Sequence, residues 1–258
     1  MKRRNFIKSS SLLSSAFILP GYALKPKKNI YNDKIKLSLI GCGGRGTGAV
    51  INALNADDNI ELISMCDVFE DRIERSLNNL KDEFKGTSKI QVKNENCFTG
   101  FDGYKKTIDN ADVVILATPP GFRPQHFEYA VNSSKHVFVE KPVATDISGI
   151  KRFIESAKIV KKKKLNVVVG LQRRYQPSYI NTFKQVKRGM VGKITSGIVK
   201  WNSRGVWVKE REKNQSELEY QMRNWYYFNW LCGDHIVEQH IHNIDAVSYT
   251  HLTLPTRL

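Results

Sequence analysis

The chain has 258 residues, 41% hydrophobic and 26% charged, a composition typical of a soluble globular protein with one or two domains and no low-complexity block. Its 41 Lys and Arg against 25 Asp and Glu give a formal net charge of +16. Nucleic-acid binding is nevertheless disfavoured. Many basic residues fall before residue 29 or in the run 161–164 at an expected helix end, and the rest do not alternate with aromatic residues.

Residues 1–28 have the pattern of an export signal and linker, with a charged head followed by a short apolar stretch rich in serine. Arg3 and Arg4, followed by Asn-Phe-Ile-Lys, resemble the signal that directs folded proteins to the twin-arginine export machinery. We therefore expect a periplasmic or otherwise exported protein. An uncleaved membrane anchor stays an alternative, because no clear cleavage site of small residues follows.

The four cysteines lie far apart and form no C-x-x-C pair, which argues against a metal site or a redox dithiol. Two of them fall at the ends of expected core strands. We predict buried free thiols at Cys42, Cys66, Cys97 and Cys232.

An apolar strand at 35–40 is followed at once by the letters GCGGRG. Gly41, Gly43 and Gly46 fit the pattern G-x-G-x-x-G. In that pattern the first glycine allows a tight turn, the second lets backbone N–H groups approach a pyrophosphate, and the third brings the next helix close to the strand. With Gly44 and Arg45 between them, these residues form the predicted cofactor loop. A plain tight turn is the alternative reading.

A second strand at 60–66 ends in Asp67, a little over twenty residues after the glycines. An acid at this position can accept hydrogen bonds from the adenosine ribose hydroxyls, and its charge repels the 2′-phosphate of NADP. The pattern therefore favours NAD over NADP, with Arg72 as the residue that could soften this preference. Asp67 as a simple helix cap is the alternative.

Further apolar strands are expected at 112–118, 136–140 and 165–171, separated by helices around 123–134 and 146–160. This alternation predicts an α/β fold in which residues 34–171 form a Rossmann domain, a doubly wound parallel sheet covered on both faces. The loop after the 112–118 strand lies at the carboxyl edge of that sheet, where ligands bind. We expect Thr118, Pro119 and His126 to contact the cofactor.

The letters VEKPVATD follow the 136–140 strand, and a charged pair directly after a buried strand is unusual away from a site. With the glycine loop and a late histidine-rich helix, Glu140-Lys141-Pro142 resembles the glucose–fructose oxidoreductase / inositol dehydrogenase / MocA family, from about Ile35 to Asp245. The resemblance implies that Glu140 and Lys141 lie at the cofactor, that Lys141 is catalytic, and that a cis peptide bond precedes Pro142. An exposed ion pair is the alternative for Lys141.

The resemblance also implies that residues 172–246 begin a second, α+β domain, which carries a mainly antiparallel open sheet that closes over the substrate. Residues 193–201 have the alternation of its first strand. We expect Arg173 and Tyr175 to reach the substrate, although surface residues would look the same. Trp225 belongs to an aromatic run, 225–230, that could stack on a sugar or build core.

The segment 233–245, GDHIVEQHIHNID, predicts a helix capped by Asp234. His235, Glu238 and His242 then share one face, and the isoleucines and His240 share the other, so His240 is expected in the core. Glu238 can support His242, which is suited to act as a general base and to contact substrate. In the family an aspartate usually stands where Glu238 stands. A metal site is disfavoured, because Lys141 is expected in the same cleft.

After Ala246 the chain reads VSYTHLTLPTRL, which has no helical pattern and does not match the family. We expect residues 247–258 to be foreign and the natural second domain to continue, so that residues 172–246 are only its first part. The full-length protein is expected to be a homo-oligomer.

The sequence predicts an NAD-dependent oxidoreductase that acts on a sugar or polyol-like substrate. Because free NAD is scarce outside the cytoplasm, an exported enzyme would keep its cofactor and favour a redox-neutral cycle. One alternative is an NAD-dependent glycoside hydrolase that uses transient oxidation. The other is a non-catalytic dinucleotide-binding protein.

Overall fold

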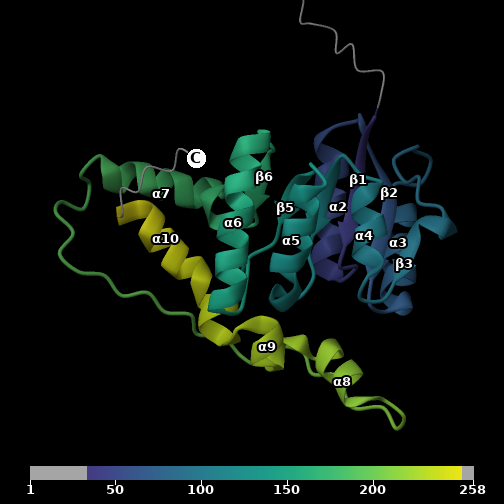
Figure 1. Ribbon diagram of the computed structural model, residues 1–258. Helices are drawn as coiled ribbons and strands as arrows, with labels where there is room; N and C mark the ends of the chain where they lie inside the picture. Colours follow the sequence, from purple (N-terminus) through teal and green to yellow (C-terminus); the bar gives the residue numbers. More distant parts are fainter. Residues whose placement is uncertain (1–33, 252–258) are drawn as a thin grey trace, which may run out of the picture. The chain divides into compact units, whose positions relative to one another are not determined.

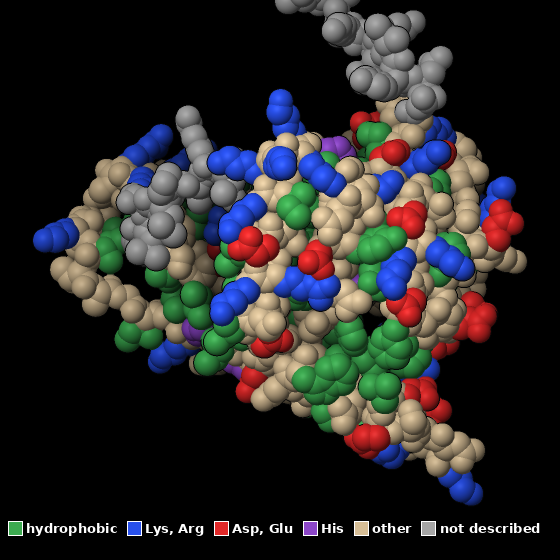
Figure 2. All heavy atoms as spheres, viewed as in Figure 1, with side chains coloured by type: hydrophobic (Ala, Val, Ile, Leu, Met, Phe, Trp, Pro, Cys, Tyr) green, Lys and Arg blue, Asp and Glu red, His purple; other side chains and the backbone are tan. Residues whose placement is uncertain are grey.

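The computed structural model of the chain describes residues 34–251, and from Ile35 onward they belong to one compact unit. The predicted export signal and the last seven residues of the tail lie outside the described residues. Within 34–251, no helix combines the length and the apolar character that crossing a bilayer requires. On the face shown in Figure 2, lysine and arginine side chains are interspersed with acidic ones rather than gathered in one patch.

A six-stranded sheet forms the centre of the fold, and every strand pair in it is parallel. The strand order is β3-β2-β1-β4-β5-β6. The bounds are β1 Ile35–Ile40, β2 Ile60–Asp67, β3 Cys97–Thr99, β4 Val113–Leu116, β5 His136–Val139 and β6 Val167–Val169. This is the predicted doubly wound arrangement. The winding reverses between β1 and β4, so that a crevice opens beyond the carboxyl ends of these two strands.

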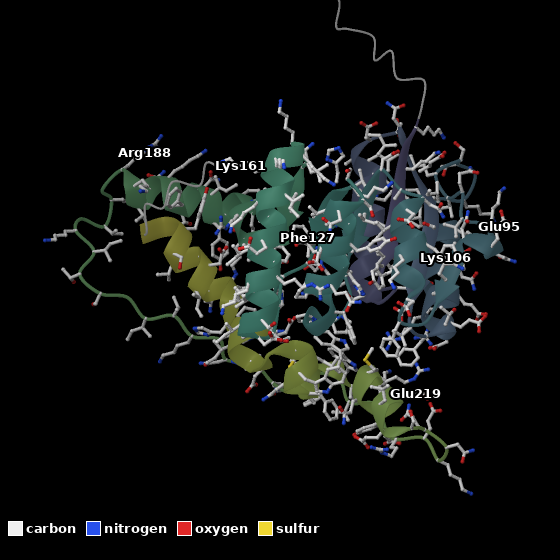
Figure 3. The ribbon with its side chains drawn as sticks, in the orientation of Figure 1. Glu95, Lys106, Phe127, Lys161, Arg188 and Glu219 are labelled. Atoms are coloured by element: carbon white, nitrogen blue, oxygen red, sulfur yellow. The ribbon has the colours of Figure 1, made fainter. Side chains whose placement is uncertain are left out.

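Helices cover both faces of the sheet, and each face has its own hydrophobic core (Figure 1). On one face α2 (Gly44–Ala56) and α3 (Glu70–Glu83) pack against β1 and β2. On the other face lie α4 (Gly103–Asp109), α5 (Arg123–Asn132) and α6 (Ile147–Lys163). Phe127, labelled in Figure 3, is fully buried on α5, and its ring stacks on that of Phe153 at 4.0 Å between centroids.

The lysine run lies where the sequence predicted a helix end. Helix α6 ends at Lys163, and Lys164 caps it in the left-handed conformation, with φ of 56°. Cations in the last turn stabilise the negative end of the helix dipole and remain in solvent.

All four cysteines are free, and three of them are buried, as expected; Cys97 is half-buried. Burial raises the pKa of the Cys66 thiol to about 12, so this group stays protonated and packs as a small apolar side chain.

After β6 the chain is helical or irregular, with no strand among the described residues. Its elements are the 3-10 turn η3 (Gln172–Arg174), α7 (Pro177–Lys187), α8 (Glu217–Arg223), the 3-10 turn η4 (Trp225–Tyr227), α9 (Asn229–Cys232), the π-helix η5 (Ile236–His240) and α10 (Ile241–His251). Short 3-10 turns η1 (Asn94–Asn96) and η2 (Pro120–Phe122) interrupt the first part.

Two expectations for this region are wrong. Residues 193–201 form no strand, because no neighbouring strand in the described part of the chain supplies the hydrogen bonds that a strand requires. The helix also does not stop at Ala246. It continues to His251, and the ring of Tyr249 on α10 packs on Phe183 of α7 at 5.2 Å, which anchors the added turn (Figure 1).

Two glycines of α2 give a matched test of how closely this helix approaches the sheet. A Cβ on Gly46 would lie 2.1 Å from the backbone oxygen of Gly41, whereas a Cβ on Gly48 would meet nothing within 4 Å. We predict that Gly46→Ala lowers the free energy of unfolding by about 2 kcal/mol or more, since helix and strand must separate. Gly48→Ala should be neutral or stabilising by up to about 1 kcal/mol.

The measurement is urea unfolding followed by tryptophan fluorescence for both variants and the parent. Equal stabilities for Gly46→Ala and Gly48→Ala would show that α2 does not pack closely against the backbone of Gly41.

Candidate functional site

A cleft of about 630 Å³ opens at the carboxyl edge of the sheet. Every residue that the sequence predicted to bind a cofactor lines it: Gly41, Gly43, Gly44, Arg45, Gly46, Asp67, Arg72, Thr118, Pro119, His126, Glu140 and Lys141. Its other wall comes from the last third of the chain and includes Trp225, Glu238 and His242. The cleft therefore brings together side chains that lie up to about 200 residues apart in sequence.

The glycine loop connects β1 to α2 with its backbone facing the cleft. Gly41 has φ of 96°, a conformation that favours glycine, and a Cβ there would lie 2.6 Å from the backbone of Ala117. Gly43 caps α2 without any side-chain hydrogen bond, and no acidic residue lies in the first turn of the helix. The N-terminal N–H groups of α2 and its dipole are thus available to an anion.

Asp67 ends β2 beside the glycine loop. Its carboxylate accepts hydrogen bonds from the backbone N–H of Cys42, at 2.8 Å, and of Phe69, at 3.1 Å. Burial raises the pKa of the Asp67 carboxyl, and these two N–H groups oppose that shift by stabilising the charge. The carboxylate is therefore fixed at the cleft, where its remaining lone pairs can accept further hydrogen bonds.

Thr118 and His126 follow β4 in the chain, and both line the cleft. The Thr118 hydroxyl lies 3.3 Å from His126 Nδ1. Burial, with a smaller contribution from the positive charge of Arg123, lowers the pKa of His126 to about 3. His126 is therefore neutral at any ordinary pH and acts as a hydrogen-bonding group rather than as a cation.

Glu140 and Lys141 point into the cleft from the end of β5. Glu140 is 4% exposed and pairs with Arg45 of the glycine loop at 2.5 Å. The peptide bond between Lys141 and Pro142 is cis, as the family resemblance implied.

Lys141 forms a buried ion pair rather than the exposed one considered as its alternative. Its Nζ donates to the backbone oxygen of Glu238 at 2.6 Å and to Glu238 Oε1 at 2.8 Å, and the two side chains are 11% and 8% exposed. An ammonium has three N–H donors, so one stays available for a ligand. Burial raises the pKa of the Glu238 carboxyl, and Lys141 opposes this shift.

His242 lies one turn after Glu238 and is 8% exposed. Burial lowers its pKa to about 4, and the positive charges of Lys141 and Arg173 add to the shift. Its ring stacks on Trp201 at 5.7 Å, and no polar atom of the described residues hydrogen-bonds to its buried Nδ1. His242 is thus a neutral imidazole with an unused ring nitrogen.

The prediction that Glu238 supports His242 is not what the structure shows. The Glu238 carboxylate accepts a hydrogen bond from Lys141, and neither its Oε2 nor His242 Nδ1 has a hydrogen-bond partner among residues 34–251. An ion pair with a buried ammonium is stronger than a hydrogen bond to a neutral imidazole, which explains why the Glu238 carboxylate pairs with Lys141 and not with His242. Asp245, the other acid near His242, pairs with Arg174 at 2.5 Å.

Glu238 and His242 line the cleft as predicted, but the isoleucine face of the histidine segment is not the buried core face that the sequence predicted. Glu238 and His242 are buried at the cleft, whereas Ile236 and Ile244 are 67% and 43% exposed, and His240 is only half-buried. Asp234 has a left-handed φ of 68°, and the helical segment that begins there continues as the π-helix η5 from Ile236 instead of as a regular α-helix. Periodicity revealed two faces but not which one meets the sheet domain.

Two of the predicted substrate residues lie outside the cleft lining. Arg173 donates to Asn243 Oδ1, and its guanidinium lies over the rings of Tyr179 and Trp201, so it braces α10. Tyr175 is 65% exposed. Trp225 does line the cleft, and its ring packs 5.8 Å from that of Trp207.

Sequence reasoning missed Arg123, which is 4% exposed and lines the cleft. Its Nη1 donates to the backbone oxygen of Pro142 at 2.5 Å, so it holds the segment that carries Lys141. Burial lowers its pKa to about 10, against the attraction of Glu238 and Glu140. An arginine inside an expected helix gave no signal of this role. Trp207, Lys209 and Gln239 were missed in the same way.

The residues present fit a dinucleotide. An uncapped helix N-terminus and a carboxylate after the second strand lie at one cleft of suitable volume, and its lining residues Glu238 and His242 each carry a buried polar atom without a hydrogen-bond partner in residues 34–251. No group of three His, Cys, Asp or Glu that could hold a metal ion is found in the described part of the chain.

Comparison with protein families gives a match over residues 35–171 to the model described as an oxidoreductase family with an NAD-binding Rossmann fold. A glycosyl hydrolase family 109 protein of Streptomyces coelicolor is 26% identical over 165 residues, which are 63% of this chain and 33% of that protein. The inositol 2-dehydrogenase of Salmonella typhimurium is 26% identical over 162 residues, 61% of this chain and 43% of that protein. The chain thus spans between about a third and a half of these relatives.

Solved structures show the same fold. The myo-inositol 2-dehydrogenase of Lactobacillus plantarum superposes with a TM-score of 0.60 at 23% identity, covering 84% of this chain and 56% of that one. The WlbA dehydrogenase of Bordetella pertussis, in complex with NADH and UDP-GlcNAcA, superposes with a TM-score of 0.59 at 21% identity, covering 85% and 56%.

The buried imidazole of His126 makes folding stability depend on pH. The folded protein binds this proton only near pH 3, whereas an unfolded histidine binds it near 6.5. Between these values the unfolded chain holds more protons, so the free energy of unfolding falls as pH falls. We predict that His126→Gln flattens this decline between pH 6.5 and 4 by about 2 kcal/mol.

The exposed His235 provides the control. His235→Gln should follow the parent curve in urea unfolding at each pH. A His126→Gln curve parallel to that of the parent would contradict a buried neutral imidazole.

Proposed function

The chain belongs to the oxidoreductase family with an NAD-binding Rossmann fold, and we propose that it transfers a hydride between NAD and a hydroxyl-bearing carbon of a sugar or polyol-like substrate. One observation carries the proposal: the ammonium of Lys141 and the imidazole of His242 line the same cleft as the glycine loop. A relative named inositol 2-dehydrogenase supports a polyol-like substrate.

NAD, when bound, accepts the hydride that leaves the substrate carbon. Oxidation of a hydroxyl also releases a proton, so a base must be within reach. His242 suits this role because its low pKa, about 4, keeps it neutral and because its buried Nδ1 has no partner in residues 34–251. The third donor of Lys141 can hold the substrate oxygen and stabilise its developing negative charge.

Glu238 and Arg123 position the ammonium. Glu238 holds Nζ through its carboxylate and its backbone oxygen, and Arg123 holds the next residue through the Pro142 carbonyl. Because Glu238 and Arg123 are both buried, the Lys141 side chain has few other rotamers available. We assign Lys141 and His242 as catalytic residues and Glu238 and Arg123 as positioning residues.

A glycoside hydrolase that oxidises its substrate transiently is a second candidate. The relatives named glycosyl hydrolase family 109 protein favour it. In such a cycle a hydroxyl is oxidised, the resulting ketone acidifies the neighbouring C–H, the aglycone is eliminated, water adds, and the hydride returns. Export of a folded protein, which residues 1–28 indicate, would favour a cycle without net use of NAD.

Aryl glycosides separate the two candidates. Aglycone release without NADH accumulation supports the hydrolase, and NADH accumulation with a free polyol and no aglycone release supports the dehydrogenase. If neither reaction occurs, a non-catalytic dinucleotide-binding protein is the remaining reading.

Replacing either catalytic group should abolish turnover without preventing NAD binding. We predict that Lys141→Met and His242→Asn each lower kcat/KM about 100-fold or more, since each removes a group that we assign to the reacting atoms. His240→Asn, a change of the half-buried imidazole outside the cleft lining, should leave kcat/KM unchanged.

The pH profile gives an independent readout. Because His242 stays neutral down to pH of about 4, the parent kcat/KM should not fall between pH 7 and 5 through this group. An acid limb near 6.5 that His242→Asn removes would contradict the assignment of a neutral base in a buried site.

A further inference from the structure

Arg223, the last residue of α8, contacts the first turn of α3 across 152 positions of sequence. Its guanidinium donates to both carboxylate oxygens of Asp71, at 3.0 and 3.2 Å, and lies 4.0 Å from the centre of the Phe69 ring. Arg223 Nε also donates to Glu219 of the same helix at 2.9 Å, which fixes the orientation of the guanidinium (Glu219 is labelled on α8 in Figure 3). Arg223 thus has partners on both sides.

One partner of Arg223, Phe69, belongs to the cleft lining. Its backbone N–H donates to Asp67, the carboxylate that ends β2. In a Rossmann domain an acid at this position binds the adenosine ribose. Phe69 would therefore border the adenosine half of NAD when this cofactor is bound.

The residues next to Arg223 line the same cleft from the opposite wall. Met222 precedes it and Trp225 follows it, and both are part of the lining. Their segment is itself pinned, because the buried Asn224 side chain bonds the backbone N–H and carbonyl of Lys209. Arg223 therefore connects this side of the cleft to Phe69 and Asp71 on the other side.

We propose that Arg223 is a cofactor-positioning residue: by holding Phe69 and Asp71 against α8, it encloses the adenosine half of NAD and slows its release. The inference rests on the NAD-binding fold and not on the proposed hydride transfer. It adds a residue from the last third of the chain to the part of the cleft that the glycine loop and Asp67 already define.

The chain contains a matched control in Arg211. This side chain also lies over an aromatic ring, that of Tyr220 at 4.1 Å, and also pairs with a glutamate, Glu217. Both partners belong to its own segment, on α8. Arg211→Gln therefore removes the same kinds of contact as Arg223→Gln without separating the walls of the cleft.

The test is the rate of NADH release, followed by the loss of protein-bound NADH fluorescence after mixing with excess NAD. We expect Arg223→Gln and Asp71→Asn each to speed release about 3- to 10-fold, as expected for an ion pair with a cation–π contact. The double variant should be no faster than Arg223→Gln. Arg211→Gln should release NADH at the parent rate.

A truncated ligand separates positioning from general damage to the fold. Reduced nicotinamide mononucleotide lacks the adenosine half, so its affinity should be the same for the parent and for Arg223→Gln. Unchanged NADH release from both Arg223→Gln and Asp71→Asn would overturn the proposal, as would an equal loss of affinity for the mononucleotide. If Arg223→Gln does not fold, Asp71→Asn, at a half-exposed carboxylate, decides alone. Turnover is not measured, so failure of the proposed reaction leaves the result intact.

Discussion

The site depends on one buried ion pair, between Lys141 at the end of β5 and Glu238 in the π-helix η5. Moving two charges out of water costs several kcal/mol each, and the attraction between them repays this only with good geometry and further hydrogen bonds. Lys141 meets that condition by donating to both the side chain and the backbone oxygen of Glu238. The pair fixes the helical segment that carries His242 against the sheet domain.

The electrostatics of the cleft follow from this pair and its neighbours. Lys141 neutralises Glu238, Arg45 neutralises Glu140, and the positive charge of the buried Arg123 attracts both carboxylates. Burial lowers the pKa of His242 to about 4, and the positive charges of Lys141 and Arg173 add to this shift. His242 is therefore in the unprotonated form, beside the ammonium of Lys141 in the same cleft.

Those parts of the site that depend on local sequence could be predicted, and those that depend on packing could not. The glycine turn, Asp67 and the parallel sheet follow from strand–turn–helix patterns that are complete within about thirty residues. The buried face of the 233–245 segment does not, because periodicity separates two faces without telling which one meets the rest of the protein. Burial of Glu238 is compensated by Lys141, which lies 97 residues away and is contained in no local pattern.

The same distinction explains the other differences. Residues 193–201 alternate as a strand does, but a strand forms only with a neighbour, and none pairs with them in the described part of the chain. Arg173 and Tyr175 were expected at the substrate because they follow the last strand, yet Arg173 finds aromatic and amide partners beside α10. No sequence signal indicated Arg123, although its contact with Pro142 holds the segment that carries Lys141.

A double-mutant cycle on folding stability tests the buried pair most directly. Lys141→Met and Glu238→Gln each leave one partner buried without its counterpart, and we expect each to lower the free energy of unfolding by about 3 kcal/mol or more. The double variant should cost at least about 2 kcal/mol less than the sum of the two, measured by urea unfolding. Additive losses would show that the two side chains do not interact, and would contradict the dependence of the site on this ion pair.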